Sequence, residues 1–131
     1  MTAEVNGAGP VSDLEDVLER FSEAFNSGNV EAVNALYSEE AVAVWDPGIP
    51  LSGRARLDRA TEFMSYGPAI EATVRQSLVA GDTAMVIVDW SMQTTGADGK
   101  PEHLKGVAVD ILRRDNDGNW RYLIDYPYAA Q

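Results

Sequence analysis

Residues 106–127 read GVAVDILRRDNDGNWRYLIDYP, two apolar runs separated by a short polar segment. Asp117-Gly118 marks that segment as the turn of a β-hairpin. Side chains alternate across a strand, and both runs carry apolar residues at odd and at even positions, so the hairpin needs cover on both faces. Each run also carries one carboxylate on a face that should be covered, Asp110 in the first and Asp125 in the second. These two residues are the starting point for a functional interpretation.

Length, composition and charge restrict the classes of protein to which this chain can belong. The 131 residues fit one domain, predicted over residues 11–131 after a frayed tail of residues 1–10. Ten Lys and Arg against 21 Asp and Glu give a formal charge of −11, which would repel nucleic acid and anionic membranes. There is no cysteine, so thiolate chemistry is excluded and a reducing cytoplasm is expected. No apolar run is long enough to span a bilayer.

Three helices are predicted ahead of the long strands. Ser12 caps the first helix and Gly28 ends it. Its residues at spacings of three and four form one apolar stripe, which consists of Leu14, Val17, Leu18, Phe21 and Phe25. Asn29 caps a shorter helix that runs to about Tyr37, and a third helix is predicted over residues 54–66.

A short strand is predicted over residues 41–45. It runs into residues 46–50, where two prolines and a glycine argue against any further strand or helix. The remaining chain is a meander of four long antiparallel strands, predicted over residues 70–80, 83–94, 103–114 and 120–128. This order of elements predicts an α+β fold in which the helices pack on one face of a curved sheet.

The other face of the sheet has no element left to cover it. By alternation this outer face should carry Val107, Val109, Ile111, Tyr122 and Ile124. Exposed apolar area on that scale indicates a partner, and we expect a two-fold homodimer through the sheet face.

Two segments resemble the nuclear transport factor 2-like superfamily, which includes ketosteroid isomerases and SnoaL-like proteins. LYSEEAVAVWDPG (36–48) followed by LSGRARL (51–57) is similar to its segment of strand, Asp-Pro, Gly-Arg and helix. VDILRRDNDGNWRYLIDYPY (109–128) is similar to the closing hairpin of its SnoaL-like, uncharacterised bacterial branch. The resemblance covers nearly the whole chain. It implies a cystatin-like cone of three N-terminal helices and a curved, mostly antiparallel sheet around an internal cavity.

The resemblance to ketosteroid isomerases also implies roles for two aspartates. Asp46, followed by Pro47, matches the general base, although Trp45 competes for that position. Asp110, in Asp110-Ile111-Leu112-Arg113, matches the protonated aspartate of the oxyanion hole. Phe21 stands where those enzymes carry the oxyanion-hole tyrosine, so one of two donors is missing. In this hypothesis Asp46 takes a proton and Asp110, neutral in an apolar pocket, holds the oxyanion; a protonated aspartate in ketosteroid isomerase is a known example of this device.

Other side chains are expected in the same cavity. The residues proposed to contact a ligand are Phe21, Phe25, Trp45, Phe63, Asp89, Leu112 and Asp125, although Phe21 and Phe25 are most simply explained as core. Carboxylates gathered there would share protons, pair with an arginine or bind a cation. The spacing fits no local metal motif, and we predict no metal and no cofactor. The only histidine, His103, is expected on the surface.

Two functional interpretations follow from this pattern. One is a cofactor-independent isomerase or cyclase that acts on a small apolar carbonyl compound with Asp46 and Asp110. The other is a non-catalytic domain that binds a ligand or dimerises, in which Asp110 pairs with an arginine such as Arg75 and Asp46 caps its loop. Only the first interpretation requires an aspartate with a displaced pKa.

Overall fold

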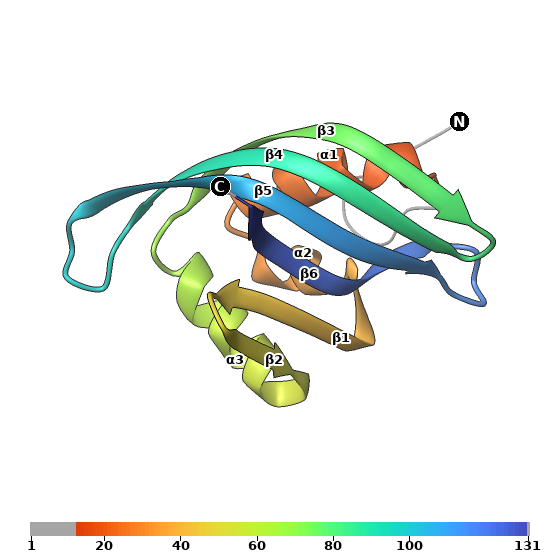
Figure 1. Ribbon diagram of the computed structural model, residues 1–131. Coiled ribbons are helices and arrows are strands. Elements are labelled where there is room, and N and C mark those ends of the chain that lie inside the picture. Colours follow the sequence, from red (N-terminus) through yellow and green to blue (C-terminus); the bar gives the residue numbers. More distant parts are fainter. Residues whose placement is uncertain (1–12, 131) are drawn as a thin grey trace.

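A six-stranded sheet in the order β2-β1-β6-β5-β4-β3 bends around the first helix (Figure 1). This computed structural model describes residues 13–130; the predicted tail of residues 1–10 and the cap Ser12 lie outside them. All neighbouring strands are antiparallel except β1 and β6, which are parallel. The α+β prediction is confirmed by elements in the order α1 (Leu14–Asn26), α2 (Val30–Asn34), β1 (Tyr37–Asp46), β2 (Ile49–Ser52), α3 (Gly53–Met64), β3 (Ala69–Ala80), β4 (Thr83–Thr95), β5 (Pro101–Arg114) and β6 (Trp120–Ala130).

Side-chain caps set where the first two helices begin. The Asp13 carboxylate accepts a hydrogen bond from the Glu15 backbone N–H at 3.0 Å, and Asn29 accepts one from Ala32 N–H at 3.0 Å. Between the helices Gly28 has φ of 75°, a left-handed conformation that favours glycine and ends α1. No helix within residues 13–130 has the length and apolar character to cross a membrane.

The prediction that residues 46–50 contain no strand is wrong at one point. Residues 49–52 form the edge strand β2, with Ile49 opposite Asp46 and Leu51 opposite Ala43 on β1. Pro50 is tolerated because β2 has a neighbour on one side only, so its missing N–H costs no hydrogen bond on the open side. The preceding strand is also longer than predicted and begins at Tyr37, where we expected the end of a helix.

A bulge in β6 overturns the predicted faces of that strand. Leu112 pairs with Tyr122 and Ile111 pairs with Ile124, which leaves Leu123 as an extra residue. Beyond Leu123 the alternation changes phase. Tyr122 therefore lies on the inner face, not on the outer face as predicted, and it shares that face with Asp125; the two residues are 4% and 8% exposed.

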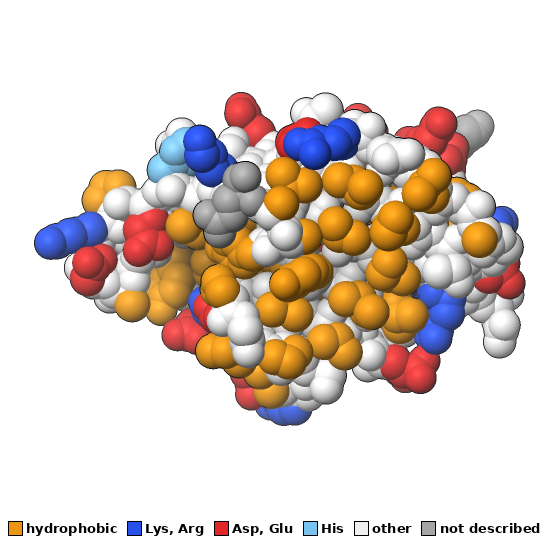
Figure 2. All heavy atoms as spheres, in the orientation of Figure 1, with side chains coloured by type: hydrophobic (Ala, Val, Ile, Leu, Met, Phe, Trp, Pro, Cys, Tyr) orange, Lys and Arg blue, Asp and Glu red, His pale blue; other side chains and the backbone are white. Residues whose placement is uncertain are grey.

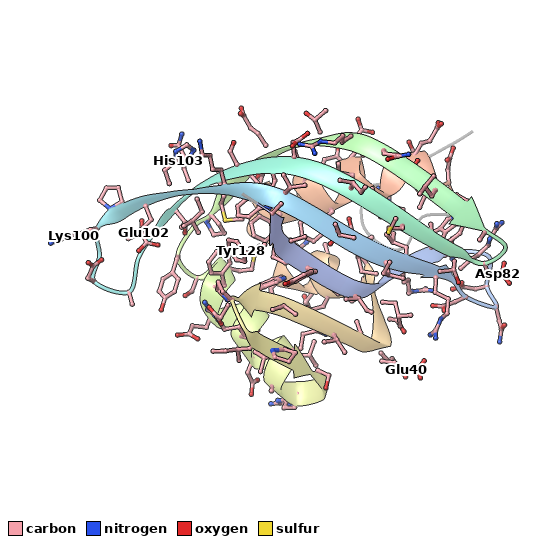
Figure 3. All side chains as sticks on the ribbon, in the orientation of Figure 1. Glu40, Asp82, Lys100, Glu102, His103 and Tyr128 are labelled. Atoms are coloured by element: carbon pink, nitrogen blue, oxygen red, sulfur yellow. The ribbon has the colours of Figure 1, made fainter. Side chains whose placement is uncertain are left out.

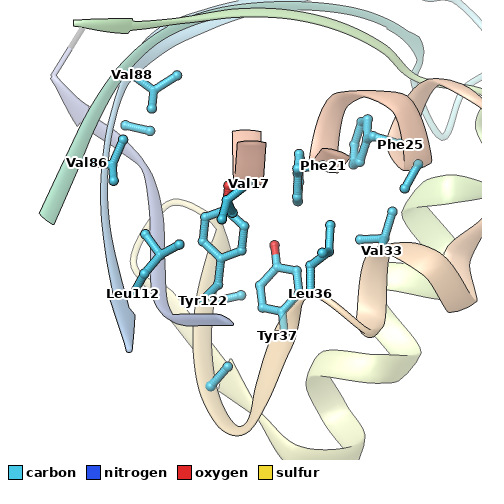
Figure 4. Close-up of a cluster of buried hydrophobic side chains, with 14 of the residues drawn as sticks. Val17, Phe21, Phe25, Val33, Leu36, Tyr37, Val86, Val88, Leu112 and Tyr122 are labelled. Atoms are coloured by element: carbon cyan, nitrogen blue, oxygen red, sulfur yellow. The ribbon is translucent and has the colours of Figure 1, made fainter. Parts of the chain in front are cut away.

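The core lies between the inner face of the sheet and the helices (Figure 4). The largest of its almost completely buried side chains are Leu36, Leu112, Val17 and Val33. Tyr37 and Tyr122 point their hydroxyl groups into this region from β1 and β6. The segment before β1 is tied to the sheet by a hydrogen bond from Tyr122 N–H to the Leu36 carbonyl at 2.8 Å.

The outer face of the sheet is apolar across its centre. Figure 2 looks onto this face and shows apolar side chains gathered over the middle strands. Ile124 and Tyr126 of β6 are 40% and 43% exposed there, and Val107, Val109 and Ile111 of β5 are half-buried. Residues 13–130 provide no element that covers this face.

We predict that Leu112→Ala lowers the free energy of unfolding by about 2–5 kcal/mol, because it opens a cavity at a side chain that is 1% exposed. The matched control is Leu78→Ala, whose side chain is 49% exposed and whose loss should change stability by less than about 0.5 kcal/mol. Urea denaturation followed by circular dichroism measures both. Equal losses in the two variants would contradict this description of the core.

Candidate functional site

A cavity of about 210 Å³ lies between the inner face of the sheet and helices α1 and α3. The predicted residues Phe21, Phe25, Trp45 and Phe63 lie in its wall, and Trp90 of β4 and Tyr128 of β6 extend the aromatic lining. The cavity is therefore mainly apolar and aromatic, as small-molecule sites usually are.

The aromatic rings of the wall are held by contacts among themselves. The Phe21 and Phe25 rings stack with centroids 5.4 Å apart, and the Trp45 and Phe63 rings meet edge to face at 5.6 Å. Rings in these arrangements stabilise one another beyond simple burial. The wall is consequently a fixed surface that suits a flat, apolar ligand.

Two carboxyl groups form the polar end of this cavity. Asp110 on β5 and Asp125 on β6 are register partners, 5% and 8% exposed, and their side chains are hydrogen-bonded to each other. Asp125 Oδ2 also accepts from the Tyr37 hydroxyl at 2.5 Å and from Trp45 Nε1 at 2.8 Å. Asp110 Oδ1 accepts from the Tyr126 backbone N–H at 3.1 Å.

Burial raises the pKa of Asp110 well above its ordinary value, and the charge of Asp125 and the hydrogen bond with it raise that pKa further. The hydrogen bond from Tyr126 N–H acts in the opposite direction and is outweighed. Burial likewise raises the pKa of Tyr37 and of Tyr122 well above 10, so both hydroxyls stay protonated. Asp110 is therefore a carboxyl group whose neutral form is favoured, and Asp125 beside it accepts the hydrogen bonds of Tyr37 and Trp45.

The Asp46 side chain lies at the mouth of the cavity in a salt bridge with Arg59. Arg59 Nε and Nη2 donate to its two oxygens at 2.8 and 3.0 Å. These hydrogen bonds lower the pKa of Asp46. A carboxylate held this way is a weak base, so the geometry argues against the role predicted for Asp46. Figure 3 shows two further residues of the lining, Glu102 and Tyr128, at the same end of the molecule.

The prediction that Asp89 points into the cavity is wrong. Val88 and Trp90 are buried on the inner face of β4, so Asp89 between them lies on the outer face. There its carboxylate accepts hydrogen bonds from Arg75 Nε at 3.1 Å and from Arg75 Nη2 at 2.5 Å. The non-catalytic interpretation suggested Arg75 as a partner of Asp110. The structure shows that Arg75 pairs with Asp89 instead.

Leu112 is on the predicted face but does not line this cavity. It is buried in the core and borders a second, apolar pocket between α1 and the strands β3 and β4. His103 is exposed near the β4–β5 turn, as predicted (Figure 3). Within residues 13–130, no three His, Cys, Asp or Glu side chains come together in a way that could hold a metal ion.

Comparison with known families agrees with this architecture. A model of the SnoaL-like domain matches residues 18–123, which run from within α1 to the start of β6 and include Asp110 but not Asp125. The chain belongs to the SnoaL-like family. It is thereby a member of the nuclear transport factor 2-like superfamily, as the sequence motifs indicated. A search of curated proteins gives no match to this SnoaL-like chain.

Solved structures similar to this SnoaL-like protein include three bacterial proteins. A conserved protein from Planctomyces limnophilus superposes with a TM-score of 0.76 at 19% identity, over 86% of this chain and 89% of the other. A protein with a cystatin-like fold from Caulobacter vibrioides gives 0.75 at 15%, over 90% and 87%. A ketosteroid isomerase-like protein from Erwinia carotovora gives 0.72 at 19%, over 86% and 89%. At these identities the likeness shows the fold alone.

Several residues of the SnoaL-like site were not predicted from the sequence. Trp90 carried a usable signal, because Val86, Val88, Trp90 and Met92 form one apolar face of β4 that we could have assigned to the cavity. The sequence around Tyr37 gave no signal of its role, because its hydroxyl reaches Asp125 only through the parallel pairing of β1 and β6. The pairing of Asp46 with Arg59 likewise depends on how α3 packs beside β1.

We predict that Asp110→Asn removes a pH dependence of stability. The pKa of Asp110 is higher in the folded state than in the unfolded chain. Between these two pKa values the folded state binds more protons than the unfolded chain, so the free energy of unfolding falls as the pH rises. Asparagine cannot ionise. The variant should therefore gain stability relative to the unaltered protein as the pH rises above the ordinary aspartate pKa of about 3.9.

Urea denaturation at a series of pH values tests this prediction. Asp58→Asn is the control, because the Asp58 side chain is 68% exposed on α3 and lies outside the cavity lining. A stability difference between D110N and the unaltered protein that stays constant across the range would show that Asp110 is not held neutral.

Proposed function

We propose that this protein binds a small, largely apolar carbonyl compound, and that Asp110 turns its single O–H from Asp125 to the carbonyl oxygen of the ligand. The observation that carries the proposal is a neutral carboxyl group buried at the end of an aromatic cavity. A neutral carboxyl can donate a hydrogen bond without bringing a charge into the apolar site. The aromatic wall supplies the contact area for the rest of the ligand.

The same site supports cofactor-independent proton transfer, the chemistry of an isomerase or cyclase. With Asp110 bonded to the carbonyl oxygen, a base removes the neighbouring C–H proton, and the electron pair of that bond moves to the oxygen as an enolate. Asp125 lines the cavity beside Asp110 and accepts hydrogen bonds from Tyr37 and Trp45, so we assign its carboxylate as the base in place of Asp46. The likeness in fold to a ketosteroid isomerase-like protein supports this reaction class.

Binding without turnover is the second candidate. The observation that favours it is the set of donors on Asp125, because hydrogen bonds from Tyr37 and Trp45 stabilise its ionised form and weaken it as a base. The cavity would then hold the carbonyl compound and release it unchanged. Both candidates require Asp110 as donor, and only the first requires exchange of a carbon-bound proton.

We predict that 2-acetylnaphthalene binds and that 2-ethylnaphthalene, which lacks the oxygen, binds about tenfold more weakly. Asp110→Ala should remove this preference, whereas Asp110→Asn should keep most of it because the amide also donates. Quenching of the fluorescence of Trp45 and Trp90, which line the cavity, measures both affinities. Equal affinity of the unaltered protein for the two compounds would contradict the donor role of Asp110.

Proton transfer is measured with 2-acetylnaphthalene in heavy water. Loss of the acetyl proton signal by NMR, faster with the unaltered protein than with Asp125→Asn, is the result expected of the enzyme. Tight binding with no protein-dependent exchange would leave the non-catalytic candidate.

We also propose that the protein forms a homodimer through the outer face of the sheet and resides in the cytoplasm. The exposed apolar side chains Ile124 and Tyr126 support the interface, since water contact with an apolar patch of this kind is unfavourable. The complete lack of cysteine supports a reducing compartment.

We predict that Ile124→Asp gives a monomer, because it places a charge in the middle of this face. Ile49→Asp is the matched control. Ile49 is 53% exposed on the edge strand β2, outside the outer-face patch, so this variant should stay dimeric. Light scattering coupled to size exclusion gives the masses. A monomeric mass for the unaltered protein at micromolar concentration would refute the dimer.

A further inference from the structure

A buried arginine lies beneath the acid pair. Arg56 of α3 is 7% exposed, and its Nε is buried without a hydrogen-bond partner. The ion pairs formed within residues 13–130 include other arginines but not Arg56. Moving a cation out of water costs several kcal/mol, so a buried arginine without a carboxylate partner calls for another source of stabilisation.

That source is the ring of Tyr37. The Arg56 guanidinium carbon lies 4.6 Å from the ring centroid, within the range of a cation–π interaction. The hydroxyl of the same ring donates to Asp125, which is hydrogen-bonded to Asp110. A continuous series of contacts therefore runs from the guanidinium through the tyrosine to the two carboxyl groups.

We infer that Arg56 is a positioning residue that supplies the positive charge for the buried acid pair, acting through the ring of Tyr37. A cation over the ring draws electron density from the phenol and makes its hydroxyl a stronger donor to Asp125. The guanidinium also balances the charge of Asp125 directly, through a region of low dielectric. Without Arg56, only neutral donors would offset that buried negative charge.

The charges around the pair are consistent with this role. The titratable groups that meet there are Tyr37 of β1, Asp110 of β5, Tyr122 and Asp125 of β6, and Arg56 of α3. Arg56 is the one cation of this group. Burial lowers the pKa of Arg56, and its interactions with Tyr37 and Asp125 act against that change. Arg59, one turn further along α3, is already paired with Asp46 at the mouth.

The test is a carboxyl-resolved NMR titration of Asp110 in the ligand-free protein. Arg56→Met and Arg56→Gln remove the charge, and each should raise the pKa of Asp110 by about one pH unit, because the positive charge that favours ionisation of the acid pair is lost. Arg56→Lys keeps the charge and should restore most of the difference. Arg54→Met is the control, since the Arg54 side chain is 86% exposed on the same helix.

An unchanged Asp110 titration in a folded neutral variant would overturn the inference, as would an equal change in Arg54→Met. Where neither neutral variant folds, the unaltered protein decides the question: the Arg56 Nε resonance should follow the titration of Asp110, and a resonance that stays constant refutes the coupling. The inference rests on the acid pair that the proposed function also uses. Because no ligand is present, its failure would leave carbonyl binding open to its own test.

Discussion

Two carboxyl groups buried side by side cannot both be ionised, and the site is arranged around that constraint. Asp110 and Asp125 are paired across neighbouring strands, and both are buried at the inner end of the cavity. Donors are distributed unequally, because Tyr37 and Trp45 both donate to Asp125 whereas Asp110 receives one backbone N–H. This asymmetry decides which group keeps the proton, and so makes one carboxyl a donor and the other an acceptor.

The sheet creates this juxtaposition through an irregularity. Without the bulge at Leu123, strict alternation would place Tyr122 and Asp125 on opposite faces of β6. The parallel pairing of β1 with β6 then brings Tyr37 and Trp45 within reach of Asp125. Regular strands would have given a stable sheet without the acid network. The functional geometry therefore depends on the places where the ladder departs from ideal pairing.

How much of this structure can be predicted from the sequence depends on whether a feature is determined by residues close together in the chain or far apart. Hairpin turns, helix caps and apolar periodicity act locally, and they correctly predicted the α+β fold and the meander. The raised pKa of Asp110 agrees with the neutral state that we expected for it. That expectation was possible because the apolar residues of the same strand indicate that the strand is buried. Asp89 was placed in the cavity because alternation defines two faces without saying which is inner. The partners of Asp46 and Asp125 come from elements distant in sequence, and no local pattern specifies them.

The distribution of charge restricts what the cavity can accept. At the mouth, Asp46 and Arg59 neutralise each other and are partly exposed, so water screens them. At the inner end, Asp110 and Asp125 are both buried, and an anionic ligand would bring a negative charge beside two carboxyl groups in an apolar surrounding. The whole chain adds a net charge of −11, which opposes the approach of anions from solution. A neutral molecule with one hydrogen-bond acceptor avoids both of these repulsions, which is why we propose a carbonyl compound for this site and not a carboxylate or a phosphate.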